Sequence, residues 1–70
     1  MPSVQESGKK IANLRRKLGM TQEELAKKVG VTVAAIGNYE SGIRAPKDII
    51  KMKLADALGE SVERIFFSEM

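Results

Sequence analysis

Apolar residues recur every three or four positions along most of this 70-residue chain, which is the spacing of one face of an α-helix. Glycine and proline stand mainly at the edges of these periodic stretches. The pattern predicts five helices, and no stretch shows the alternation that is typical of a β-strand. Because a chain of this length supports only one core, we expect a single all-α domain over residues 1–70.

The first helix is predicted to start at a capping box, in which Ser3 precedes Glu6 by three residues. It is predicted to end at Gly19, a residue type that favours the left-handed conformation after a helix. Gly8 weakens the expected first turns, so a later start near Ser7 is the alternative. The apolar positions at helical spacing are Ile11, Leu14 and Leu18.

The second and third helices are predicted to be short. Thr21 and Glu24 form another capping box, and Gly30 is expected to stop the helix that follows. The inward residues of that helix are Leu25, Ala26 and Val29. Thr32 is a good N-cap for the third helix, which is expected to end at Ser41–Gly42. This helix carries Val33, Ile36, Tyr39 and Glu40.

The connection between these two helices is itself a motif. Only Gly30, Val31 and Thr32 separate them, and a short turn with glycine between two helices is typical of a helix-turn-helix. Gly30 can adopt a positive φ, and Ala26 is small enough for the third helix to cross close to the second. The apolar residues expected to hold the pair together are Val31, Ile36 and Tyr39.

The remaining residues predict a fourth helix and a short fifth one. Pro46 fits the first turn of the fourth helix, Asp48 suits its positive end, and Gly59 is expected to end it. Its apolar residues are Ile49, Ile50, Leu54, Ala57 and Leu58. Ser61 is expected to cap the last segment, which holds Val62, Ile65, Phe66 and Phe67.

Composition argues against catalysis. The chain has no cysteine and no histidine, so it lacks thiolate and imidazole metal ligands and the commonest general base. It has no glycine-rich phosphate loop, and Glu23 and Glu24 fit the first turn of a helix better than acid–base chemistry. We expect no enzymatic activity, no metal and no cofactor.

Charge is distributed unevenly, with a formal net charge of +3. Residues 1–53 hold eleven basic and five acidic side chains, whereas residues 54–70 hold one basic and four acidic ones. A basic body favours contact with nucleic acid, although an excess of lysine also simply solvates a helical surface. No secretory signal or membrane-spanning apolar run is visible, so a cytoplasmic protein without membrane contact is expected.

The residues around the predicted turn resemble the Cro/CI-type phage repressors, also called the XRE family. The resemblance, which extends from about residue 11 to residue 67, is carried by Ile11, Leu14, Arg15, Gly19–Ala26, Gly30–Thr32, Ile36, Tyr39–Gly42, Arg44 and Pro46. It implies a compact five-helix fold of the lambda-repressor type in a prokaryotic or phage-encoded protein. It also implies a sequence-specific repressor of transcription that binds a near-palindromic operator in double-stranded DNA as a homodimer.

The resemblance places the start of the third helix in the major groove, where its outward residues approach the base edges. These residues are Val33, Ala34, Gly37 and Asn38. Only Asn38 can form a bidentate pair, which matches adenine, whereas Val33 and Ala34 offer apolar contact to thymine methyl groups or are ordinary helix surface. Better-studied members often carry glutamine or other polar residues here, so the shape of the operator is expected to carry part of the specificity.

Contacts to the DNA backbone are implied as well. Gln22 matches the family residue that bonds a phosphate at the start of the second helix. Thr32, as the N-cap of the reading helix, is a further phosphate candidate. Arg44, Lys47 and Lys51 follow that helix and can reach the flanking backbone, although each lysine is equally well explained as a solvated surface residue.

Two other sets of residues have a structural or assembly role in the family. Arg15 and Glu40 match a partly buried ion pair between the first and third helices. Ile65, Phe66 and Phe67 either complete the core or form the dimer interface, because the family commonly pairs through its C-terminal helix. Two adjacent phenylalanines cannot easily both face inward, so we expect one in the core and the other at a two-fold interface.

The weakly polar reading face keeps a second function open. The chain is alternatively a protein-interaction module, such as an antitoxin that neutralises a protein partner and binds DNA mainly to regulate its own promoter.

Overall fold

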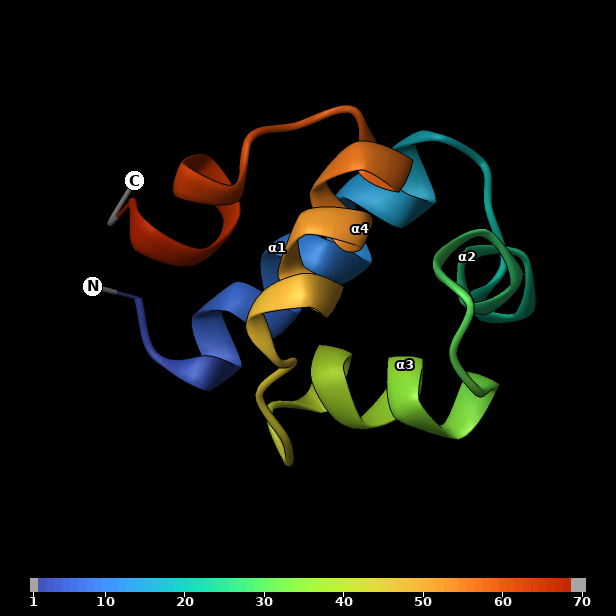
Figure 1. Ribbon diagram of the computed structural model, residues 1–70, viewed down its shortest axis with the longest axis horizontal. Coiled ribbons are helices and arrows are strands. Elements are labelled where there is room, and N and C mark those ends of the chain that lie inside the picture. Colours follow the sequence, from blue (N-terminus) through green and yellow to red (C-terminus); the bar gives the residue numbers. More distant parts are fainter. Residues whose placement is uncertain (1, 69–70) are drawn as a thin grey trace.

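The computed structural model describes residues 2–68, and within this range it contains helices and no strand (Figure 1). The elements are α1 (Val4–Lys17), α2 (Gln22–Val29), α3 (Val33–Ser41), α4 (Asp48–Leu58) and the π-helical turn η1 (Glu63–Phe67). The predicted five-helix, all-α architecture is confirmed. None of the helices in the described range is long and apolar enough to cross a lipid bilayer.

The capping boxes are formed as predicted. At the start of α1 the Ser3 hydroxyl accepts from the Glu6 amide at 3.1 Å, and the Glu6 carboxylate accepts from the Ser3 amide at 2.8 Å. The backbone hydrogen bond, followed by the one from the Ser3 side chain, lowers the pKa of Glu6. Because the capping box is formed at Ser3, the helix begins at Val4, and the alternative start near Ser7 is wrong.

One completely buried aliphatic side chain from each helical element forms the centre of the core. Burial of each stabilises the fold by about 1.5–3 kcal/mol relative to exposure. These residues are Ile11, Leu25, Ile36, Leu54 and Ile65. Around them α1 contacts α3, α4 and η1, while α2 packs on α3 and α4. This packing leaves α3 along one edge of the molecule (Figure 1).

Three predicted positions differ from the structure. Leu18 is 54% exposed because α1 ends before it. Ile49 is 58% exposed, because successive residues of a helix turn by 100° and the core side of α4 is set by Leu54 and Leu58. Pro46 lies before α4 rather than in its first turn: Lys47 is the N-cap, and Pro46 itself is buried.

Candidate nucleic-acid interface

The turn between α2 and α3 sets the direction of α3. Gly30 ends α2 with a φ of +83°, a conformation that costs glycine little and a residue with a Cβ considerably more. The amide of the next residue, Val31, donates to the carbonyl of Ala26 at 3.0 Å. The Thr32 hydroxyl then accepts from the Ala35 amide at 3.1 Å and starts α3. The turn has the length and the glycine of a helix-turn-helix.

The two sides of α3 have different roles. Ile36 and Tyr39 are buried against the core. The residues predicted to contact bases, together with the phosphate candidate Thr32, lie away from it: Thr32, Val33 and Ala34 are exposed, and Gly37 and Asn38 are half-buried. The structure thus brings all five onto the free side and N-terminal end of one helix.

Asn38 is free to use its side chain. Its backbone carbonyl accepts from the amides of Ile43 and Arg44 at 3.0 and 3.2 Å, which fixes the loop after α3. Its side-chain amide forms no hydrogen bond within residues 2–68. Both a donor and an acceptor are therefore available to a base edge.

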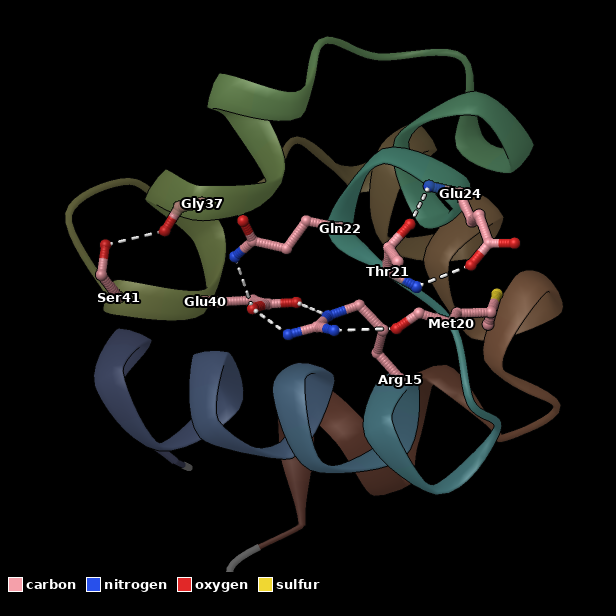
Figure 2. A network of polar contacts seen from close by, with 8 residues as sticks. All are labelled: Arg15, Met20, Thr21, Gln22, Glu24, Gly37, Glu40 and Ser41. Atoms are coloured by element: carbon pink, nitrogen blue, oxygen red, sulfur yellow. Dashed lines mark hydrogen bonds and ion pairs between the residues drawn. The ribbon is translucent and has the colours of Figure 1, made fainter.

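Arg15 and Glu40 form the ion pair between α1 and α3 (Figure 2). Arg15 Nε donates to one carboxylate oxygen at 2.7 Å and Nη2 to the other at 3.1 Å, while Nη1 donates to the carbonyl of Met20 at 2.8 Å. The side chains are only 10% and 7% exposed. The hydrogen bond and charge of Glu40 raise the pKa of Arg15, so the guanidinium stays charged. The pair holds α3 against α1.

Gln22, the first residue of α2, joins this pair. Its Nε2 donates to Glu40 Oε1 at 2.9 Å, so a residue expected to contact phosphate is also tied to the polar network beneath α3 (Figure 2). This contact could not be predicted from the sequence, because it depends on the crossing of three helices.

The basic residues after α3 divide into two sets. Arg44 and Lys47 are exposed in the loop and at the N-cap of α4. Lys51 instead lies with its ammonium 5.4 Å and 5.3 Å from the ring centres of Phe66 and Phe67. A cation over aromatic rings stabilises the C-terminal turn, so Lys51 is reassigned from DNA contact to packing.

The C-terminal aromatic pair is split as expected, with Phe66 4% exposed and Phe67 44% exposed. Ile65 is completely buried. Ile65 and Phe66 therefore belong to the core of the protomer, and their prediction as dimer contacts is wrong. Phe67 alone of the three is placed where a second subunit can touch it.

A group of side chains on α1 was not predicted from the sequence to be part of the interface. Lys9, Asn13 and Arg16 are exposed and line one groove together with Gln22 and Gly37. Their spacing of four and three residues places them on one face of α1. That spacing was the available signal, but it became meaningful only when the structure placed this face beside α3.

Comparison with known proteins agrees with this architecture. A family model described as Helix-turn-helix matches residues 11–65. An uncharacterized HTH-type transcriptional regulator of Methanothermobacter thermautotrophicus is 49% identical over 53 residues, which is 74% of this chain and 77% of that protein.

Two solved structures are similar over nearly their whole length. The P22 c2 repressor in complex with a synthetic operator superimposes with a TM-score of 0.87 at 32% identity, covering 90% of this chain and 96% of that one. The restriction-modification controller protein C.AhdI from Aeromonas hydrophila gives a TM-score of 0.85 at 30% identity with the same coverage. The chain belongs to the XRE family of Cro/CI-type helix-turn-helix transcriptional regulators.

Proposed function

We propose that the chain is a cytoplasmic, sequence-specific transcriptional repressor that inserts α3 into the major groove of a near-palindromic operator. The observation that carries this proposal is the two-sided character of α3. Its inner side is fixed by the core and by the Arg15–Glu40 pair, while the opposite side presents Asn38 with an unused amide. A rigid helix with a free, bidentate side chain is suited to reading base edges.

In this proposal specificity has a direct and an indirect part. Asn38 pairs with the N6 and N7 atoms of adenine, and Val33 and Ala34 contact thymine methyl groups. Gly37 offers only backbone, which lets the helix approach the groove closely. Because these residues provide few hydrogen bonds, the shape and deformability of the operator contribute the rest.

Phosphate contacts set the position of the domain on DNA without selecting sequence. We assign them to Gln22 and Thr32, at the N-terminal ends of α2 and α3, and to Arg44 and Lys47, beyond the C-terminal end of α3. All four have at least part of the side chain accessible, and the last two are cationic.

The operator is proposed to be near-palindromic because the acting species is proposed to be a homodimer. Phe67 is the candidate contact, since it is a large apolar side chain that the protomer leaves 44% exposed. Two recognition helices related by a two-fold axis would lie about 34–36 Å apart, one turn of DNA. The P22 c2 relative, a repressor solved with an operator, supports the repressor role.

The alternative remains an antitoxin-like module whose main ligand is another protein. Exposed apolar side chains on α4, Ile49 and Met52, are the observation that favours it. Co-purification of a stoichiometric partner, with only weak and unselective DNA binding by the isolated chain, would support this second function over the first.

The proposal is tested by selecting bound sequences from random duplex DNA with the purified chain. We expect one near-palindromic site, a defined footprint on it, and affinity that falls steeply as salt rises. Recovery of sequences without a common site would contradict sequence-specific repression.

A further inference from the structure

A groove beside α3 brings side chains of α1 that have no role in the proposed function next to Gln22 and Gly37, which have one. It lies between α1, the start of α2 and α3, and has a volume of about 360 Å³. Its lining consists of Lys9, Ala12, Asn13, Arg16, Gln22, Gly37, Glu40 and Ser41. Figure 2 shows four of these residues, Gln22, Gly37, Glu40 and Ser41, around the polar network. Because Gly37 belongs both to this lining and to the proposed reading face, the groove adjoins the surface that faces DNA.

The groove is electropositive. Lys9 and Arg16 are exposed, and within residues 2–68 neither side chain forms an ion pair or a hydrogen bond. The acidic residue of the lining is Glu40, whose carboxylate is neutralised by Arg15. Two uncompensated positive charges therefore flank a polar groove, which favours an anion.

Gln22 lines this groove, and its side-chain amide has a hydrogen-bond donor to spare. A carboxamide nitrogen carries two hydrogens, and Glu40 Oε1 accepts one of them at 2.9 Å. A carboxylate accepts only, so Glu40 holds the nitrogen and not the oxygen of the amide toward itself. The second N–H then remains available beside Lys9 and Arg16.

We infer that a phosphate of the DNA backbone sits in this groove, bound by the cations of Lys9 and Arg16 and by the free N–H of Gln22. This assigns α1 as a second DNA-contacting element, with Glu40 as a positioning residue for Gln22. The inference rests on the proposed function, because the phosphate belongs to the strand that runs past α3 while α3 reads the groove.

The test is the salt dependence of affinity for the selected operator, measured for Lys9→Gln and Arg16→Gln. Lys53→Gln is the matched control, since Lys53 is an exposed lysine on α4, outside the groove. Loss of one phosphate contact makes the plot of log affinity against log salt shallower, with a decrease of about 0.9 in the magnitude of its slope. We expect that decrease per subunit when both substitutions are combined, and a smaller one in each single variant because the other cation still contacts the phosphate. The control should keep the wild-type slope, and all variants should keep the same preferred sequence.

Groove variants with the wild-type slope would overturn the inference and leave the proposed function intact. A wild-type chain that shows no operator preference would contradict the proposed function itself. A measurement on the unmutated protein gives an independent check: bound operator should protect the Lys9 amine from acylation and leave Lys53 reactive. Equal reactivity of Lys9 with and without operator would also overturn the inference.

Discussion

Gly8 of α1 packs directly on the backbone of Tyr39 in α3: a Cβ built on Gly8 would lie 2.3 Å from the Tyr39 carbonyl oxygen. The carbonyl of Glu40 would be almost as close, at 2.6 Å. Both distances are too short for real atoms, and both neighbours are backbone that has little freedom to move. The glycine that weakens α1 locally is therefore what permits α1 and α3 to approach, so that Arg15 can reach Glu40.

Replacing Gly8 by alanine should destabilise the protein, although alanine is the better helix former by about 1 kcal/mol. The clash pushes α1 away from α3, and overpacking of this kind typically lowers the free energy of unfolding by about 1–3 kcal/mol. Denaturant unfolding measures the change. The matched control is Gly37→Ala in α3, where an added Cβ meets nothing within 4 Å. That variant should be as stable as wild type or slightly more stable, and equal stability changes in the two variants would contradict the packing argument.

Removal of Glu40 should be severe. Glu40→Ala leaves the nearly buried Arg15 guanidinium without its partner and Gln22 without its acceptor. We expect the free energy of unfolding to fall by about 3–5 kcal/mol, as for other buried pairs that lose one member. Glu60→Ala, which breaks a partly exposed pair with Arg64 at 3.9 Å and a hydrogen bond from the Ser61 amide, should change it by only about 0–1 kcal/mol. An unchanged melting curve for Glu40→Ala would show that the pair does not hold α3.

The first turn of α1 should loosen in acid. Because hydrogen bonds from Ser3 lower the pKa of Glu6 below its ordinary value of 4.5, the folded state favours the carboxylate. This stabilisation is present at higher pH and is lost as pH falls below 4.5 and through the lowered pKa. The Ser3 amide chemical shift and its hydrogen exchange should follow that titration. Glu6→Gln keeps a capping side chain that does not titrate, so a similar acid transition in this variant would assign the effect to another group.

The two adjacent phenylalanines should respond differently to truncation. Phe66→Ala creates a cavity in the core and should lower the free energy of unfolding by about 3–5 kcal/mol. Phe67→Ala should lower it by no more than about 1 kcal/mol, the value of its contact with Lys51, but should weaken self-association. Sedimentation at tens of micromolar should give a dimer for wild type and a monomer for Phe67→Ala. A monomeric wild type under these conditions would argue against a dimer that is stable without DNA.

Helix ends were predictable from sequence because their causes are local. Ser3, Thr21 and Thr32 cap the residues that follow them within one turn, so a short window of sequence contains the whole interaction. The five-helix order followed from these signals and the apolar spacing. Ile49 was misjudged because it was counted among the apolar residues of α4 without regard to its angle: at 100° per residue it lies about 140° around the helix from Leu54.

The parts that could not be predicted depend on helices that meet in space. Gly8 looked like a defect until its contact with α3 was visible. Gln22 was predicted to contact phosphate, but the hydrogen bond that holds its amide to Glu40, 18 positions later, was not predicted. The groove that includes Lys9 and Arg16 needed the packing of three helices, so from sequence these side chains were indistinguishable from other surface cations.

The most direct test of the account is selection of bound sequences from random duplex DNA, carried out in parallel with wild type, Asn38→Ala and Asn13→Ala. Asn38 is assigned to base reading. Asn13 instead lines the groove beside α3 in which a phosphate is inferred to sit, so its replacement is expected to affect only affinity. The account predicts that Asn38→Ala loses the preference for adenine at one position of each half-site, while Asn13→Ala selects the wild-type site. An unchanged site for Asn38→Ala would contradict the claim that α3 reads DNA through this residue.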